Sequence, residues 1–220
     1  MTNAEILEHG RKLFQSAENL RRSAPELDAL LESLWEILEN EEFFGEIADL
    51  GDEDSGGDGE WIASAYAYNA GILSRPARAP GQRGASKKPK QIGTISIVAR
   101  LCNSKDIDGE LPDWPWLNQT CLIVGWHPKQ NPDDYWEIEN FDPEDENLAS
   151  IVHIGDGLWA WRESEVDYAY FFALPIFALT NEEVLKRFAL RPVRALFDSD
   201  DPKSQAEDAF RDVPVLSPNE

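Results

Sequence analysis

The fold is decided by two neighbouring stretches, Gln91–Leu101, which reads QIGTISIVARL, and Thr120–Trp126, which reads TCLIVGW. In the first stretch apolar residues occupy alternate positions, as expected for a strand with one buried face. The second is apolar at nearly every position, which is typical of a strand buried on both faces in the middle of a sheet. The two stretches therefore predict a sheet with a covered centre.

Other strand-like runs lie on both sides of this centre. They are rich in aromatic and β-branched residues and comprise Trp61–Leu73, Tyr135–Phe141, Ser150–Ile154, Leu158–Trp161 and Tyr168–Leu174. The sequence Gly155-Asp156-Gly157 joins two of them and predicts a hairpin. We expect a mainly antiparallel sheet of about five to seven strands.

The N-terminal residues have helical periodicity. Residues 3–22 place Ile6, Leu13 and Leu20 near one face. The sequence Ser23-Ala24-Pro25-Glu26 then has the spacing of a capping box with proline in the first turn, and leucines follow at helical intervals. We therefore predict a helical hairpin over residues 1–50, with the second helix running to about Leu50.

The remaining segments complete an α+β prediction. A loop is expected at GDEDSGGDG, residues 51–59. Thr180-Asn181-Glu182-Glu183 predicts a capped C-terminal helix that packs on the sheet, runs through Ala189 and is stopped or interrupted by Pro192. We expect residues 60–197 to form one compact unit with the hairpin, and residues 198–220 to form a flexible acidic tail.

Composition limits the classes of function. The chain has 220 residues, eight tryptophans and a formal net charge of −22. Such a charge repels nucleic acid and anionic lipid and attracts basic protein surfaces. The two cysteines, Cys102 and Cys121, form no disulfide framework, and no signal-peptide pattern or membrane-length apolar run is present. We therefore expect a cytoplasmic protein that does not bind membranes.

The acidic residues are concentrated in two segments. Between Arg22 and Arg75 there are fourteen acidic residues and no Lys or Arg, and between Lys129 and Arg162 there are nine acids and no base. Charge runs of this kind are usually solvated surfaces, but they also serve as docking surfaces for basic partners. The acidic candidates for partner binding are Glu32, Glu36, Glu39, Glu46, Asp49, Asp52, Glu53, Asp54, Asp133, Asp134, Glu137 and Glu139.

Two further segments are candidates for recognition. Trp114 and Trp116, in Asp113-Trp114-Pro115-Trp116, are either loop residues that contact a partner or plugs of the core, whereas Trp126 and Trp136 are expected in the core. The Pro- and Gly-rich segment 75–90 carries six bases and no acid. If the chain contacts nucleic acid at all, we expect the contact here, through Arg75, Arg78, Arg83, Lys87, Lys88 and Lys90. The alternative is an insertion that folds back on the acidic body.

Catalytic chemistry has weaker support. His127 and His153 would have to approach each other or one of the cysteines to form a nucleophile pair. The carboxylates between Asp133 and Asp142 could hold a divalent cation or act as acid and base, but such clusters usually form the wet side of an edge strand. Residues 52–58 lack the ligand spacing of a calcium loop, and no phosphate, dinucleotide, serine-hydrolase or zinc-protease motif occurs. We predict no cofactor and no metal.

Three hypotheses remain. The first is a non-enzymatic protein that covers the basic or catalytic surface of a partner such as a toxin or a nuclease. The second is a DNA mimic that occupies a nucleic-acid-binding cleft, and the third is a hydrolase or transferase with a His/carboxylate site. Size and charge resemble those of small bacterial immunity and inhibitor proteins, a likeness in composition that involves no motif and transfers no site residue.

Overall fold

The computed structural model describes residues 3–40, 44, 46–54, 65–74, 90–102, 114–117, 119–128, 151–162 and 168–218. Within these residues seven strands form one antiparallel sheet in the order β1-β2-β3-β4-β7-β6-β5. Their bounds are β1 Glu46–Asp54, β2 Ala65–Ser74, β3 Lys90–Arg100, β4 Cys121–His127, β5 Ile151–Gly155, β6 Leu158–Arg162 and β7 Tyr168–Pro175. The predicted α+β class with an antiparallel sheet is confirmed.

The topology consists of two meanders that meet in the middle. Strands β1 to β4 pair consecutively, and β5 to β7 return so that β7 pairs with β4. All seven residues of β4 are buried, as its apolar sequence predicts. The predicted hairpin between β5 and β6 turns at Gly155, Asp156 and Gly157, all of which have positive φ.

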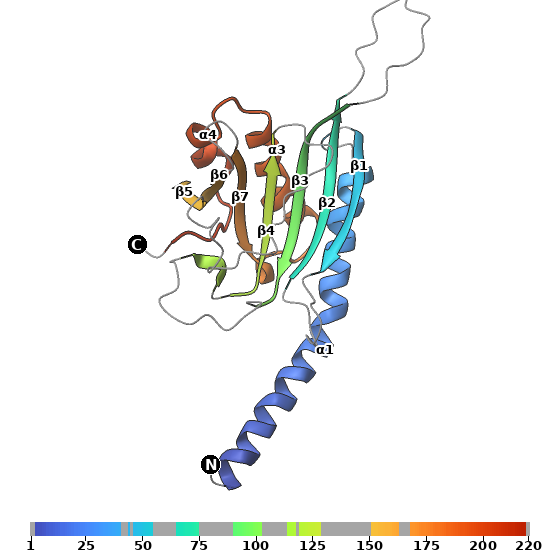
Figure 1. Cartoon of the computed structure of the whole chain (residues 1–220), viewed down its shortest axis with the longest axis vertical. Coiled ribbons are helices and arrows are strands. Elements are labelled where there is room, and N and C mark those ends of the chain that lie inside the picture. Colours follow the sequence, from blue (N-terminus) through green and yellow to red (C-terminus); the bar gives the residue numbers. More distant parts are fainter. Residues whose placement is uncertain are drawn as a thin grey trace, which may run out of the picture.

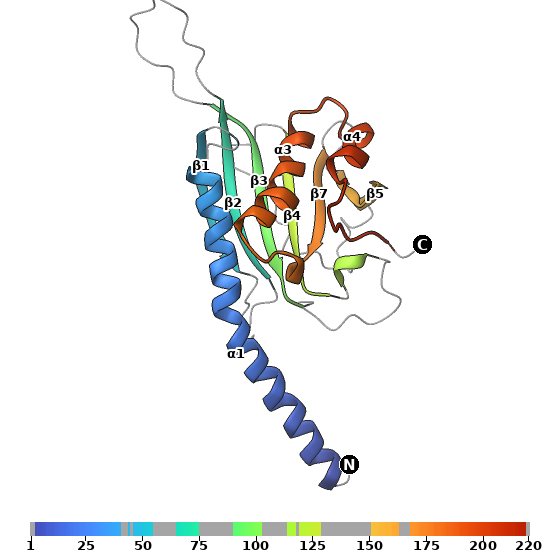
Figure 2. The same ribbon diagram turned by 180° about the vertical axis from the view of Figure 1, so that it is seen from behind.

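Helices cover one face of the sheet (Figure 2). They are α1 Asn3–Asn40, α2 Glu182–Leu185, the π-helical turn η5 Lys186–Leu190, α3 Arg191–Phe197 and α4 Pro202–Ala209, with a short 3-10 turn η4 at Ile176–Ala178. Leucines of α1 with Val193 and Leu196 of α3 form one core with the residues of the sheet that face them. At Gly93 a Cβ atom would come 2.8 Å from the ring of Phe197, so glycine lets α3 lie close to β3.

The N-terminal prediction is wrong in two respects. Residues 3–40 form one helix with Pro25 inside it, and the residues from Glu46 onward form strand β1 where the second helix was expected to continue. The predicted loop at residue 51 also begins within β1, since residues 51–54 pair with β2. Pro25 removes one helical hydrogen bond, but its side chain is exposed and the apolar periodicity continues through it, so the helix is not interrupted.

The C-terminal segment also differs from its prediction. Asn181 caps α2 by accepting a hydrogen bond from the Val184 backbone at 3.0 Å. Of the two outcomes expected at Pro192, interruption is the one found: a π turn precedes it, and the helix resumes as α3 and continues to Phe197. Residues 198–218 are not a frayed tail: they include α4, and Phe210 is buried against Phe172 with ring centroids 4.9 Å apart.

The opposite face of the sheet carries an aromatic cluster. Trp116, in the 3-10 turn η1 (Pro115–Leu117), is 1% exposed. Its ring meets Trp159 edge-on at 4.7 Å and Phe171 at 5.3 Å, and Trp114 stacks on it at 5.5 Å. These tryptophans therefore belong to a second core, and of the two alternatives predicted for Trp114 and Trp116 their burial favours the core plug over the partner contact.

This burial predicts a large effect on stability. Trp116→Ala removes an indole that three aromatic rings contact, and we expect it to lower the free energy of unfolding by about 3–5 kcal/mol. Urea denaturation followed by far-UV circular dichroism measures the change. The control is Val152→Ala, at a side chain on β5 that is 45% exposed and outside the second core, where a change of at most about 1 kcal/mol is expected. Equal losses in the two variants would contradict the second core.

Candidate functional site

The outer face of α1 carries three of the predicted acidic residues. Glu32, Glu36 and Glu39 are all exposed, whereas Leu31, Leu34 and Leu38 on the inner face are buried against the sheet. No basic residue lies in the last turn of the helix. We call Glu32, Glu36 and Glu39 the acidic face of α1.

Other predicted acids lie on the neighbouring edge strand. Strand β1 is at the end of the sheet, next to the C-terminal half of α1 (Figure 1). In the backbone register Asp49 pairs with Ala70, and Asp52, Glu53 and Asp54 pair with Tyr68, Ala67 and Tyr66. Glu46 begins the strand. The fold therefore brings two acid-bearing elements to one edge of the molecule.

Several candidates lie outside the described residues. They are Asp133, Asp134, Glu137 and Glu139 of the second acidic segment, together with Arg75, Arg78, Arg83, Lys87 and Lys88 of the basic segment. Lys90 is described: it is exposed and begins β3. Trp136 and the predicted strand 135–141 also lie outside the described residues.

The fold separates the proposed catalytic residues. His127 ends β4 and is buried, whereas His153 lies on β5, three strands away across β7 and β6. At ~4.8 Å per strand step the two backbones are about 14 Å apart. Cys121 is at the opposite end of β4 from His127, six residues or about 20 Å along the strand. The described geometry therefore assembles no dyad from these three residues.

His153 has a structural environment of its own. Its ring lies 4.7 Å from that of Trp159, and its Nε2 accepts a hydrogen bond from the Gly157 backbone at 3.3 Å. Partial burial lowers the pKa of His153, and the nearby Asp156 opposes this shift. A neutral imidazole that accepts the hydrogen bond in the β5–β6 turn accounts for the residue.

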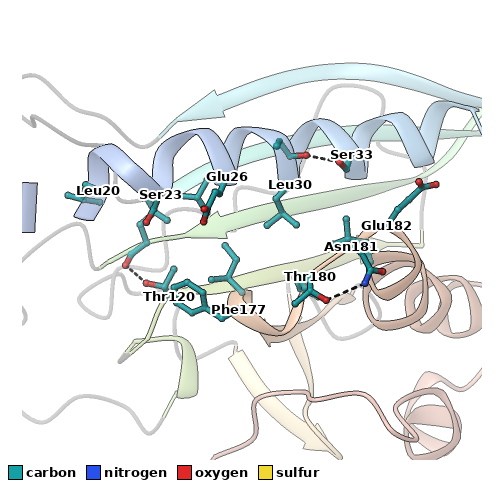
Figure 3. Close-up of a pocket in the computed structure, with 16 residues that line it drawn as sticks. Leu20, Ser23, Glu26, Leu30, Ser33, Thr120, Phe177, Thr180, Asn181 and Glu182 are labelled. Carbon is teal, nitrogen blue, oxygen red and sulfur yellow. Dashed lines mark hydrogen bonds between the residues drawn. The ribbon is translucent and has the colours of Figure 1, made fainter. Parts of the chain in front are cut away.

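A groove that sequence analysis did not identify lies between α1 and the segment that follows β7 (Figure 3). Its volume is about 590 Å³. One wall is α1 from Leu20 to Ser33, and the other runs from Ile176 to Leu185 through Phe177. Thr120, which donates to the Leu101 carbonyl at 3.0 Å, lies at one end. We call this the α1 groove.

The chemistry of the α1 groove suits an apolar ligand with polar edges. Leucines and Phe177 supply much of its surface, and the titratable groups among its lining residues are the carboxylates Glu26 and Glu182. Glu182 also pairs with Lys186 at 2.7 Å. The hydroxyl of Ser33 donates to its own helix, to the Ala29 carbonyl at 2.7 Å. The groove therefore holds no described histidine or cysteine that would act as a base or nucleophile.

The helix continues beyond the groove as an arm. The N-terminal half of α1 extends past the sheet (Figures 1 and 2). Leu7, Leu13 and Phe14 on this arm are 65%, 73% and 69% exposed. Exposed apolar side chains grouped on one helix indicate an interaction surface. The signal is present in the sequence, because the apolar face predicted for residues 3–22 has no partner in the described residues.

The two cysteines are expected to react very differently with thiol reagents. Burial raises the pKa of Cys121 to about 12, with Arg100 acting in the opposite direction, whereas Cys102 is exposed. At pH 8 the Cys121 thiolate fraction is about one in ten thousand, and the chain also shields the sulfur. We expect titration with a disulfide reagent to find one fast thiol in the folded protein and two after unfolding. Rapid labelling of folded Cys102→Ser would contradict this.

Two surfaces thus emerge from the described residues, the acidic face of α1 and the α1 groove with its adjoining arm. Within the described part of the chain no helix is long and apolar enough to cross a membrane, and no group of three or more potential metal ligands is found. No protein-family model matches the chain, and comparisons with curated proteins and with solved structures likewise found no match.

Proposed function

We propose that this protein is a non-enzymatic binding protein whose acidic face covers a basic or catalytic surface of a partner protein, as an immunity or inhibitor protein does. The observation that carries the proposal is the position of the acids. Glu36 and Glu39 lie near the C-terminal end of α1, where the helix dipole disfavours negative charge. Folding alone gives no reason to place carboxylates there, so a binding role accounts for them better.

The acidic face is also held in place before any partner arrives. Leu31, Leu34 and Leu38 anchor the helix to the sheet, so the backbone that carries the three carboxylates is already ordered. Pre-ordering lowers the entropic cost of association. The net charge of −22 further favours encounter with a cationic partner, through a field that salt screens over about 10 Å at 0.1 M.

A protein partner fits the acidic face better than mimicry of DNA does. Exposed acids at positions 26, 28, 32, 36 and 39 of α1 span thirteen helical steps, or about 20 Å. This is about one charge per 4 Å, less than half the density of duplex DNA, which carries about one per 1.7 Å. The mimic hypothesis therefore needs additional carboxylates from elsewhere in the chain.

An enzymatic function has less support among the described residues. His127 and His153 are three strands apart, and the α1 groove is lined by leucines, hydroxyls and two glutamates. The hypothesis of a site between Asp133 and Asp142 falls outside the described residues. Replacing His127, His153 and that cluster remains its direct test.

The proposal predicts charge-dependent binding that is local to α1. We expect Glu32→Gln/Glu36→Gln/Glu39→Gln to slow association with a basic partner captured from the native host at low salt by about tenfold, because the charges nearest the contact steer the encounter. The rate would be measured by surface plasmon resonance across a salt series. The wild-type rate should fall as salt rises, and that of the variant should fall less steeply.

The control removes equal charge elsewhere. Glu183→Gln/Asp200→Asn/Glu207→Gln changes three exposed acids outside α1 and should leave association close to the wild-type rate. Equal slowing of association in both variants would contradict a binding site located on α1, because net charge alone would then explain the effect. If duplex DNA competes for the captured partner, the mimic hypothesis gains; if no basic partner is captured at low salt, the proposal fails.

A further inference from the structure

The apolar face of α1 has one phase along the whole helix. Apolar residues recur every seven positions at Ile6, Leu13, Leu20, Leu27 and Leu34. Leu34 is buried on the sheet, Leu27 is half-buried, and Leu13 is 73% exposed. A seven-residue apolar repeat is the pattern of helices that pack along one another. The arm therefore has the sequence of a packed helix but lacks a packing partner in the described chain.

The dimensions of the arm match those of the α1 groove. The exposed arm from Leu7 to Leu20 covers thirteen helical steps, about 20 Å. The α1 wall of the groove, from Leu20 to Ser33, covers the same number of steps. Leu20 is the shared end of both, because it lines the groove and is 36% exposed. Two helices that cross antiparallel near Leu20 would each lay an arm against the other's groove.

Charge selects the direction of this pairing. Residues 3–22 carry four bases, Arg11, Lys12, Arg21 and Arg22, and three acids, a net of +1, whereas residues 23–40 carry five acids and no base, a net of −5. An antiparallel pair places the +1 half of one helix along the −5 half of the other. A parallel pair would place the two −5 halves together, which like charges disfavour.

We propose that the occupant of the α1 groove is the arm of a second copy of this chain, in a symmetric antiparallel dimer. The contact is isologous, since each copy contributes one arm and one groove. Leu13 of one copy then lies near Leu27 of the other. The groove's Glu26 faces the arm side that bears Arg11 and Lys12. Glu32, Glu36 and Glu39 do not line the α1 groove, but their charges belong to the −5 half that favours the antiparallel direction. Variants of Leu13, Phe14 and Phe177 leave these carboxylates unchanged, so failure of the dimer is distinguishable from failure of the proposed function.

An anionic membrane is a poorer occupant for the arm. The arm has exposed leucines and a phenylalanine beside basic residues, which membrane-surface helices also have. However, its net charge is only +1, and the rest of the chain carries −22 − (+1) = −23. Repulsion between that body and an anionic surface opposes binding, whereas the dimer pairs the arm with the chain's own acidic half.

The proposal predicts dimers that depend on both arm and groove. Light scattering after size exclusion, over about 1–100 µM, should show wild-type dimer. Leu13→Glu/Phe14→Glu in the arm and Phe177→Asp in the groove should each raise the dissociation constant at least tenfold. All three side chains are exposed in one copy, so the melting curve of the dissociated chain should not change. Gln15→Glu, on the opposite side of the arm, should remain dimeric.

A crosslinking experiment tests the direction. Two separate variants are made in a Cys102→Ser background, Ser16→Cys on the arm and Ser23→Cys in the groove. The two positions lie seven residues apart on one helix, about 10 Å, which is too far for a disulfide within one chain. The antiparallel dimer predicts a disulfide between the two variants when they are mixed, in excess of either homodimer. A wild-type chain that stays monomeric throughout the dilution series, with or without vesicle binding, would overturn the proposal, as would dimers that survive both charged variants.

Discussion

The burial of β4 on both faces is the constraint on which the rest of the structure depends. Every residue of this strand is covered, so the sheet must have a layer on each side. Leucines of α1 with Val193 and Leu196 of α3 supply one layer, and the indoles of Trp114 and Trp116, of which Trp116 packs on Trp159 of β6, supply much of the described part of the other. Because these tryptophans are buried, the proposed recognition surfaces are those of α1 and its surroundings.

The two halves of helix α1 differ in what their apolar residues contact. The inner leucines of the C-terminal half fix the helix to the sheet, which leaves Glu32, Glu36 and Glu39 outside. The N-terminal half keeps the same apolar phase but passes beyond the sheet (Figure 1). Pro25 lies between the halves and costs one backbone hydrogen bond. The helix continues through this position although the described chain gives the exposed residues Leu7, Leu13 and Phe14 no packing partner.

Periodicity predicted the sheet well, because the two faces of a strand alternate in burial and its apolar and polar residues alternate with them. Strands β2, β3, β4 and β7 lie where their patterns indicated, and the hairpin at Gly155 is present. Local signals for the start and the end of a helix were less reliable. Ser23-Ala24-Pro25-Glu26 has the spacing of a helix start, yet the helix passes through it. At Pro192 the predicted interruption is present as a π turn, after which the helix resumes as α3. The error at Ser23 arises because the spacing of a capping box can also occur inside a helix, where the one hydrogen bond that Pro25 removes does not end it.

The candidate sites could be predicted from the sequence only where local patterns determine which side chains are exposed. Which acids of α1 face outward could be predicted from the buried leucines, but Trp114 and Trp116 could not be assigned, because a Trp-Pro-Trp loop has the same sequence whether it covers a core or a partner. The α1 groove forms between segments about 150 residues apart, and no local pattern encodes such a meeting. The sequence does contain a seven-residue apolar repeat whose members from Leu13 to Leu27 are covered by the sheet only in part. An apolar helix face that extends beyond the sheet on which it packs is a physical reason to look for a second molecule.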